Sequence, residues 1–426
     1  MKVCVIGSGG REHALAWRLQ ASPSVEAVYA LPGSKAMEEV AVCAPVKWED
    51  SEAVVAYVKE HNIDLVVIGP EAPLVAGLSD VLRDAGIAVF GPSKGAAQLE
   101  GSKVFAKDLM KKYNIPTAAY GVFTDVAAAK QFIDEVGAPI VVKADGLAAG
   151  KGVVVAMTVD EAYAAVEDML AGNRFGEAGH TVVIEEFMDG EEASLLAFAD
   201  GHKAVPMISS QDHKRIFDGD KGPNTGGMGT YAPAPVMTDE LLKIAQDTIL
   251  TPMIDALKQE GLPYVGCLYA GLMITDKGPR VVEFNARFGD PETQVVLPLF
   301  KGDLGKVMMD CANGTLNADD VVWHDGAAAC VILASKGYPE TSHKGDVISG
   351  DVVSHSDTSV VFHSGTAWRD GHFETAGGRV LGVVGMGSTL QSALDVAYDR
   401  VGQITFDGAQ YRKDIGRKAF KHLEGR

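Results

Sequence analysis

Two oxygen-bearing side chains, Glu283 and Asn285, alternate with Phe284 in the run VVEFNARFGDPE. Alternate residues of a strand point to one face, so the spacing predicts that these oxygens lie side by side. Such hard ligands suit Mg²⁺ that bridges nucleotide phosphates. A lone pattern of this kind is more often an ordinary polar strand face, but the flanking Val and Phe residues indicate a strand buried on its other side. Arg287 and Asp290 follow, where they could meet an acyl phosphate or an anionic substrate.

A glycine-rich loop, residues 146–152, lies between two strand-like runs in VVKADGLAAGKGVVVA. The first strand ends on Lys143 and the loop contains Lys151, so backbone amides could close over phosphates while a lysine supplies charge. The loop is not a P-loop, because no Ser or Thr follows Lys151 and no helix follows the loop. A purely structural glycine hairpin is the alternative, and the nearby ExN pattern makes it less favoured.

A second glycine cluster, Gly7, Gly9 and Gly10, follows a strand and precedes a helix, so its amides could hold a phosphate. The pattern departs from a dinucleotide fingerprint, because Glu12 stands where a small residue is expected. LPGS also follows the second strand, where an acidic residue is expected. NAD binding is therefore disfavoured, and a tight turn that needs only glycine geometry is the structural alternative.

Composition limits the classes of function. The chain of 426 residues is long enough for more than one buried core. Its formal charge of −19 argues against general nucleic-acid binding. Five scattered cysteines without CxxC spacing argue against a disulfide framework or a zinc site, and they favour a reducing, cytoplasmic compartment. No apolar run approaches ~18 residues, so no membrane span is expected.

The elements that must position these residues begin with a parallel sheet. Residues 1–100 alternate Val- and Ile-rich runs with helical patterns, which indicates βαβ units. The expected strands are VCVIG, VEAVYAL, DLVVIG and IAVFG, and each ends in a Gly or Pro turn. Helices are expected from about Glu12, over 52–61 and after Leu74. Ligands gather at the carboxyl ends of such strands.

A small α+β module is expected over residues 120–190, with one helix over 126–136. Thr158 and Glu161 have the spacing of a capping box and should begin a second helix, which ends near Leu170.

The segment 209–235 is too rich in Gly, Pro and charge for a strand and too long for an idle connection, so a functional loop is expected. A helix over 239–261 follows, and then the strands YAGLMIT and PRVVEFN. A strand-rich unit resumes at residue 325.

A series of motifs in order resembles the glycinamide ribonucleotide synthetase (phosphoribosylamine-glycine ligase) family of the ATP-grasp superfamily. These motifs are GSGGREHA, GPEAPLVAG, GPSKGAAQLEGSK, VVKADGLAAGKGVVVA, EEFMDGEEAS, SQDHKR, GPNTGGMG, YAGLM and EFNARFGDPETQ. The likeness extends to the C-terminal GGRVLGVV and RKDIG and is weakest over residues 340–375.

The resemblance implies an ATP-dependent carbon–nitrogen ligase of de novo purine biosynthesis. Glycine and 5-phosphoribosylamine would react through glycyl phosphate to give glycinamide ribonucleotide, ADP and phosphate. The implied cofactors are ATP and Mg²⁺ or Mn²⁺. A cytoplasmic monomer that binds neither nucleic acid nor membrane is expected. The implied fold is a multidomain α/β protein. It has a doubly wound N-terminal domain (1–101), an ATP-grasp domain (102–324) with a mobile α+β lid (120–190), and a C-terminal αβ domain (325–426).

Site residues are carried over by position. The resemblance implies nucleotide binding by Lys103, Lys143, Gly146, Gly150, Lys151, Gly152, Glu185, Glu186, Phe187, Met188 and Glu192. It implies metal binding by Glu283 and Asn285, and catalytic roles for Arg287, Lys143 and Asp290. Among these, Glu192 would take the ribose hydroxyls and residues 185–188 the adenine.

Substrate residues are implied in the same way. Gly9, Gly10, Arg11 and Glu71 are expected to receive phosphoribosylamine, while Asp212, Lys214, Gly226 and Gly227 would frame a glycine pocket. Asp212 could also be an ordinary loop acid.

Two other functions are compatible with the nucleotide residues. One is a different ATP-grasp ligase or carboxylase, such as a biotin carboxylase-like enzyme, which would differ in its substrate loops. The other is a nucleotide-binding sensor without turnover. The joint presence of both lysines, the ExN pair and Arg287 argues against a degraded site.

Overall fold

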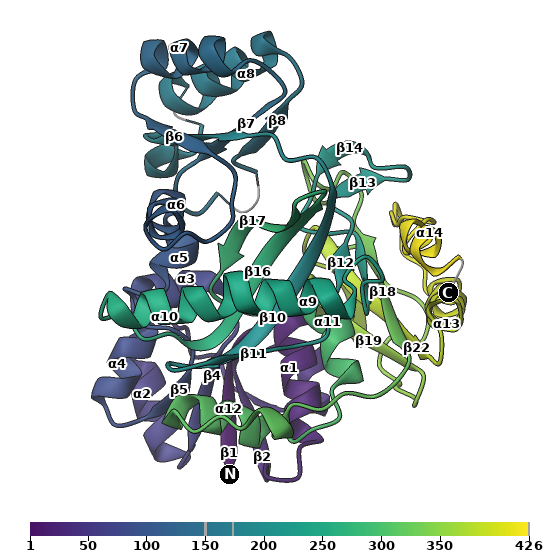
Figure 1. Ribbon diagram of the computed structural model, residues 1–426. Helices are drawn as coiled ribbons and strands as arrows, with labels where there is room; N and C mark the ends of the chain where they lie inside the picture. Colours follow the sequence, from purple (N-terminus) through teal and green to yellow (C-terminus); the bar gives the residue numbers. More distant parts are fainter. Residues whose placement is uncertain (149–150, 173, 425–426) are drawn as a thin grey trace.

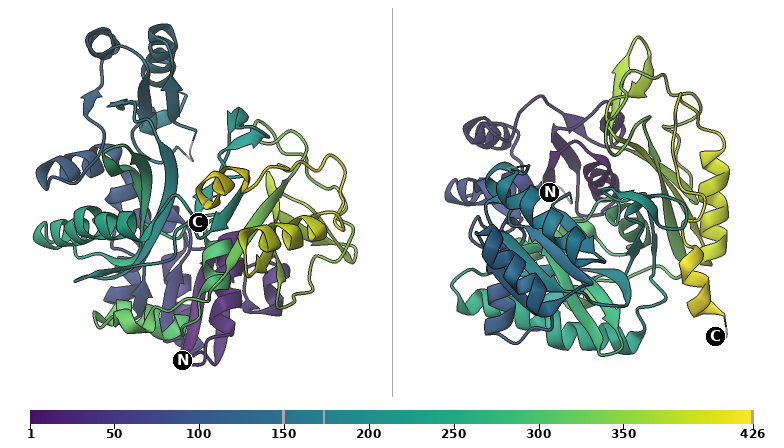
Figure 2. Two further views of the ribbon diagram at one scale, coloured as in Figure 1. Left: turned by 45° about the vertical axis from the view of Figure 1, so that its right-hand side comes forward. Right: turned by 90° about the horizontal axis from the view of Figure 1, so that it is seen from above.

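The computed structural model describes residues 1–148, 151–172 and 174–424. Figure 1 shows the N-terminal strands at the bottom, a central sheet above them, and the C-terminal elements to one side. A small module, drawn in blue, stands at the top. In the left view of Figure 2 this module and the N-terminal strands again lie at opposite ends of the central sheet.

The N-terminal sheet is parallel, with strand order β3-β2-β1-β4-β5. Its strands are β1 Lys2–Gly7, β2 Ala27–Pro32, β3 Val42–Cys43, β4 Leu65–Ile68 and β5 Ala88–Phe90. Its helices are α1 Gly10–Gln20, α2 Ser51–Glu60, α3 Glu71–Ala76 and α4 Leu78–Asp84. The predicted doubly wound domain is confirmed, although the short β3 was not expected. The order reverses between β1 and β4, so the loops after these two strands meet in one crevice.

The module forms a separate four-stranded antiparallel sheet, in the order β6-β9-β7-β8. Its elements are β6 Tyr120–Phe123, α7 Val126–Val136, β7 Ile140–Ala144, β8 Val153–Ala156, α8 Val159–Val166, a π turn Glu167–Ala171 and β9 Val182–Glu186. The two helices pack on a hydrophobic core of the module's own. Thr158 begins α8 as predicted, because its hydroxyl accepts the Glu161 N–H at 3.2 Å.

The central sheet has the order β11-β10-β16-β17 and is antiparallel. Its strands are β10 Glu191–Asp200, β11 Ala204–Pro206, β16 Val265–Thr275 and β17 Gly278–Asn285. Around it lie α5 Gln98–Gly101, α6 Lys103–Lys112, α9 Asp239–Ala245, α10 Thr251–Gln259, α11 Thr293–Val296 and α12 Leu304–Asn313. The helix expected over 239–261 forms as α9, a π turn Gln246–Leu250 and α10.

The prediction that segment 209–235 holds no strand is wrong. It forms β12 Gln211–Asp212, β13 Arg215–Phe217, β14 Lys221–Asn224 and β15 Gly229–Ala232. β15 pairs with β18, so its backbone groups find partners in a distant part of the chain. Gly229 permits this approach, because a Cβ there would lie 2.8 Å from the Cys330 carbonyl oxygen.

The C-terminal sheet therefore combines strands from two regions, in the order β12-β15-β18-β22-β19. Its later elements are β18 Ala327–Ala334, β19 Ser359–His363, β22 Arg379–Gly387, α13 Leu390–Val401 and α14 Phe420–Leu423, with a hairpin of β20 Thr366–Arg369 and β21 His372–Thr375. Short 3-10 turns occupy Ala36–Glu39, Gly176–Gly179, Leu297–Leu299, Ala318–Asp320 and Arg417–Ala419. Among residues 1–148, 151–172 and 174–424, no helix is both long and apolar enough to span a bilayer.

Two buried histidines hold the C-terminal sheet to its neighbours in the neutral form. His213 Nε2 accepts the Gly416 N–H at 3.3 Å, and its Nδ1 faces the Gly229 carbonyl at 3.0 Å. His363 Nε2 contacts the Val352 carbonyl at 2.8 Å. Burial lowers the pKa of each to about 4.

We expect the free energy of unfolding to decrease as the pH is lowered, because both histidines are buried in the neutral form. Unfolding raises each pKa from about 4 to an ordinary value of about 6.5, so each histidine takes up a proton on unfolding at intermediate pH. The stabilisation is complete above pH ~6.5 and is lost as pH falls, by about 3 kcal/mol per histidine at pH ~4. Thermal unfolding between pH 7.5 and 4.5 should show a weaker pH dependence in His363→Gln than in the parent. The control His180→Gln changes an exposed side chain and should leave this pH dependence unchanged. The same dependence of melting temperature on pH in all three proteins would contradict the role given to His363.

Candidate functional site

A small cavity of ≈ 30 Å³ lies between the central sheet and the start of segment 211–235. Its walls are formed by Glu192, Ala193, Ser194, Asp212, Lys214, Tyr269, Gly271, Leu272, Val282 and Glu283. Residues predicted separately for ribose, glycine and metal therefore meet at one place. A larger cavity of ≈ 400 Å³ beside His202 and Gln246 contains none of the predicted site residues.

The predicted metal pair lies on the open face of β17. Phe284 is buried at 2% exposure, whereas Glu283 is exposed and Asn285 is half-buried. Within the described residues neither polar side chain has a hydrogen-bond or ion-pair partner, and no three His, Cys, Asp or Glu side chains form a metal cage. Two free oxygen ligands without a cage suit an ion that takes its other ligands from nucleotide phosphates and water.

Two predicted lysines lie under the glycine loop. Lys103 Nζ donates to the carbonyls of Ala144 at 2.8 Å and Gly146 at 2.9 Å, so it holds the first half of the loop. Lys143 is buried, pairs with Glu185 and donates to the Val282 carbonyl at 3.2 Å. Burial lowers the pKa of Lys103. Burial also opposes the charge of Lys143, but the carboxylates around it raise its pKa overall.

The glycine loop requires glycine at defined points. Gly146 has φ +80°, and a Cβ at Gly152 would lie 2.7 Å from that of Ala148. Lys151 is exposed, and its N–H donates to the Ala148 carbonyl at 3.0 Å. The prediction for Gly150 lies outside the described residues.

The segment predicted to contact adenine follows β9. The side chain of Glu185 is buried between Lys143 and a residue not predicted, Lys107. Glu186 is exposed and pairs with Arg280 at 3.4 Å, while Phe187 and Met188 are half-buried beside it. Glu192, at the start of β10, reaches the shared cavity.

Arg287 and Asp290 join the central sheet to its neighbours. Arg287 Nε lies 3.4 Å from Glu71 Oε2 of the N-terminal crevice and 3.4 Å from Glu100 Oε1. Burial opposes the charge of Arg287, but these carboxylates raise its pKa. Asp290 Oδ2 accepts the Arg11 N–H at 3.4 Å.

The second unpredicted residue in this region is Arg379, from the first position of β22. Its Nη1 donates to the carbonyls of Gly226 and Asp290, each at 2.9 Å, and lies 3.8 Å from Asp290 Oδ1. Burial raises the pKa of Asp290, but Arg379 and Arg11 lower it overall. The C-terminal sheet thus reaches into the site.

The N-terminal loop is organised by Glu12. Its Oε1 accepts the Gly9 N–H at 3.0 Å, and its Oε2 accepts from Arg11 Nε at 2.5 Å. A Cβ at Gly7 would lie 2.4 Å from Glu12 Cγ, so the carboxylate fills the space beneath the loop. One amide predicted for phosphate binding is therefore already hydrogen-bonded, and Arg11 is buried rather than extended toward solvent. Gly10 lies where a Cβ would meet Ser364 Oγ at 2.4 Å.

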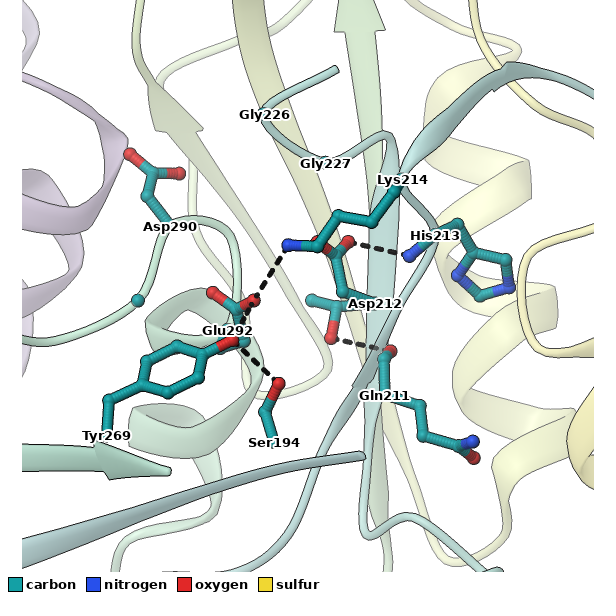
Figure 3. Close-up of polar contacts among 12 residues, drawn as sticks. Ser194, Gln211, Asp212, His213, Lys214, Gly226, Gly227, Tyr269, Asp290 and Glu292 are labelled. Atoms are coloured by element: carbon teal, nitrogen blue, oxygen red, sulfur yellow. Dashed lines mark hydrogen bonds and ion pairs between the residues drawn. The ribbon is translucent and has the colours of Figure 1, made fainter. Parts of the chain in front are cut away.

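The predicted glycine pocket contains more polar groups than the sequence indicated (Figure 3). Lys214 Nζ lies 2.7 Å from Asp212 Oδ2 and 3.8 Å from Glu292 Oε1. Tyr269 donates to Glu292 Oε1 at 3.0 Å and contacts Ser194 Oγ at 2.8 Å. Desolvation of Lys214 opposes its charge, although the side chain is partly exposed, and the neighbouring carboxylates raise its pKa well above the usual value overall.

Gly226 and Gly227 lie beside this group, and a Cβ at Gly227 would be 2.6 Å from Asp212 Oδ2. Tyr269 and Glu292 belong to the motifs YAGLM and GDPETQ, and Arg379 belongs to GGRVLGVV. The sequence analysis includes these motifs but predicts no role for Tyr269, Glu292 or Arg379.

Comparison with known proteins identifies the family. Three profiles of phosphoribosylglycinamide synthetase match the chain in succession: the N domain over residues 1–100, the ATP-grasp (A) domain over 101–293 and the C domain over 328–418. The chain belongs to the phosphoribosylglycinamide synthetase family. The predicted family and the predicted three-part fold are both confirmed.

Individual relatives agree with this family. The phosphoribosylamine–glycine ligase of Halalkalibacterium halodurans is 52% identical over 98% of this chain and 97% of its own. The crystal structure of phosphoribosylamine–glycine ligase from Thermotoga maritima has a TM-score of 0.85 at 34% identity, covering 98% of this chain and all of that one (100%). The biotin carboxylase domain of the 2-oxoglutarate carboxylase from Hydrogenobacter thermophilus has a TM-score of 0.73 at 17% identity, covering 96% and 91%. That last likeness concerns the fold alone.

We expect Glu283→Gln to separate activity from stability. Glu283 is exposed and unpaired among the described residues, so its loss should change the melting temperature little. A carboxylate that holds a metal against developing phosphate charge is worth on the order of 100-fold in turnover. ADP release and thermal unfolding should be measured together, with exposed Glu340→Gln as control. Near-normal ADP release by Glu283→Gln would contradict the metal assignment.

Proposed function

We propose that the chain joins glycine to 5-phosphoribosylamine with consumption of ATP, and that it forms glycinamide ribonucleotide, ADP and phosphate in de novo purine biosynthesis. The observation that carries this proposal is the shared cavity, where Glu283, which has no hydrogen-bond or ion-pair partner among the described residues, lies beside Asp212 and Lys214. The nearly full-length relatives named phosphoribosylamine–glycine ligase support it.

The chemistry explains the need for such a site. A carboxylate is a poor acylating group, so ATP first phosphorylates glycine to glycyl phosphate, and phosphate leaves when the amine attacks. This route needs no protein nucleophile. The chain's own residues position the reactants and neutralise charge on the transferring group.

The residues proposed to bind the nucleotide fit this order of steps. Glu283 and Asn285 would hold Mg²⁺ or Mn²⁺, which supplies charge neutralisation at phosphate oxygens. Lys103 and Lys143 hold the phosphates beneath loop 146–152. The adenine lies against residues 185–188 and the ribose hydroxyls against Glu192.

The proposed glycine pocket is lined by charged and polar side chains. Asp212 and Glu292 set two carboxyl groups against the single ammonium of Lys214, which suits a second cation, the amino group of glycine. Burial raises the pKa of Glu292, and a cation beside it favours its charged form.

Phosphoribosylamine enters from the N-terminal crevice. Glu71 contacts Arg287 and the Arg11 N–H contacts Asp290, while Tyr269 and Glu292 of the proposed glycine pocket act on Arg287 electrostatically. Arg287 stabilises the acyl-phosphate transition state, and the carboxylates of Glu71 and Glu100 fix its guanidinium.

We also propose a monomer that acts in the cytoplasm without nucleic-acid or membrane partners. The five cysteines are unpaired and four of them are buried, which suits a reducing compartment. The charge of −19 disfavours polyanions.

The direct test measures ADP formation with ATP, Mg²⁺, glycine and freshly made phosphoribosylamine, omitting each in turn. We expect full turnover only in the complete mixture, and product analysis should find glycinamide ribonucleotide. Biotin with bicarbonate replaces the two substrates in a parallel reaction. Turnover there, or binding of nucleotide without any turnover, would contradict the proposal and favour a carboxylase or a sensor.

We propose the domain division 1–101, 102–324 and 325–426, with residues 120–190 as a lid. The separate core of the module supports a unit that moves as a body. Closure shields glycyl phosphate from water. β15, which this division assigns to the ATP-grasp domain, pairs with β18 of the C-terminal sheet and links the two domains.

Lid closure predicts a change in hydrogen exchange. Peptides that cover residues 140–156 should become protected when Mg²⁺ and a non-hydrolysable ATP analogue bind, because the loop closes over the phosphates. Peptides from α13 serve as an internal reference. Unchanged exchange over 140–156, with binding confirmed by calorimetry, would rule out closure.

A further inference from the structure

A buried row of three charges connects the module to the central sheet. Glu185, at the end of β9, pairs through Oε1 with Lys107 and through Oε2 with Lys143. The three side chains are only 4–6% exposed. One carboxylate is therefore shared by two ammonium groups, and the row carries one surplus positive charge.

Lys107 is held on the side of the row away from the cavity. Its Nζ donates to Thr117 Oγ1 at 2.7 Å and to the Ala118 carbonyl at 3.2 Å. Thr117 in turn donates to the Val281 carbonyl at 2.7 Å, in β17 of the central sheet. These contacts and Glu185 occupy the Lys107 ammonium, so we assign it no direct contact with phosphate.

Lys143 lies at the other end of the row, toward the nucleotide. It follows directly into loop 146–152 through Ala144, whose carbonyl binds Lys103. Its Nζ reaches the Val282 carbonyl, next to Glu283. Glu185 is its ion-pair partner, while Glu283 and Glu192, two residues proposed for the nucleotide and its metal, act on it from a longer distance.

We propose that Lys107 is a positioning residue that draws Glu185 away from Lys143 and so keeps the charge of Lys143 available to a nucleotide phosphate. This inference rests on the proposed nucleotide site. Without Lys107, both oxygens of a buried carboxylate would serve one lysine, and the row would be neutral. A neutral pair attracts a phosphate much less than a row with a surplus positive charge, because screening is weak in a buried site.

The protonation states agree with this arrangement. Burial raises the pKa of Glu185, but its two lysine partners lower it overall, so the carboxylate is charged. Burial lowers the pKa of Lys107, whereas the carboxylates near Lys143 raise the pKa of that residue.

A double-mutant comparison tests charge against packing. Lys107→Met keeps the length of the side chain and makes the row neutral. Lys107→Met with Glu185→Gln restores one surplus positive charge, now on Lys143 alone. Lys107→Arg keeps the original charge. Dissociation constants for MgADP and for a non-hydrolysable ATP analogue should be measured by calorimetry in the absence of glycine.

We expect Lys107→Met to weaken binding of both nucleotides about 10-fold and to raise the KM for ATP equally, with the KM for glycine changed less than 2-fold. Glu185 also belongs to the segment proposed to contact adenine, so Glu185→Gln alone is the reference for the double variant. The double variant should bind within about 3-fold of Glu185→Gln, because Lys107 acts through Glu185, and Lys107→Arg should bind within about 3-fold of the parent. Parent-like binding by Lys107→Met would overturn the proposal, and so would a further loss of about 10-fold in the double variant relative to Glu185→Gln.

Should Lys107→Met fail to fold, the remaining variants still decide the matter. Binding by the double variant close to that of Glu185→Gln, with parent-like binding by Lys107→Arg, supports the proposal, and a gap of about 10-fold between the double variant and Glu185→Gln overturns it. Because the readout is nucleotide binding, a failure of the proposed glycine reaction leaves this test intact.

Discussion

Charged side chains inside a protein need partners of opposite charge. At the turn after β17, such partners come from all three sheets. Arg287 lies between Glu71, from the N-terminal crevice, and Glu100, from the helix that leads into the central domain. Three residues later, Asp290 faces Arg379 from the C-terminal sheet. These side chains are partly buried, so each charge depends on the partners that the other sheets supply. The three sheets are therefore joined at this turn.

Charged groups with protein partners can be told apart from groups that remain open to a ligand. Arg287 and Asp290 have protein partners, and so do the lysines beneath the glycine loop. Glu283 is different, since it lies exposed beside the cavity and is unpaired within the described part of the chain. Lys103 and Lys143 act on Glu283 electrostatically without a direct contact, so its oxygens stay open to a ligand. Paired and open charged groups therefore lie within a few residues of the end of β17.

Local patterns predicted local structure well. The alternation around Phe284 correctly indicated one buried and one open strand face, and the spacing of Thr158 and Glu161 correctly marked a helix start. Contacts between distant segments were not predictable from one sequence. Lys107 reads as an ordinary helix lysine until β9 brings Glu185 beside it, and Arg379 is separated from Gly226 by 153 residues. The strands in segment 209–235 were missed for the same reason, because their pairing partner is β18.

The N-terminal crevice shows how one side chain changes what a common fold can bind. A dinucleotide site needs small residues beneath its first loop so that a pyrophosphate can approach the backbone. Here the Glu12 carboxylate fills that space, takes the Gly9 amide and holds Arg11. Arg11 compensates the negative charge of Glu12 within the protein, so it is the side chain itself that occupies the space a pyrophosphate would need. The crevice is thereby closed to a dinucleotide at its base. A single phosphate bound higher, near the junction with Arg287, remains compatible with this geometry.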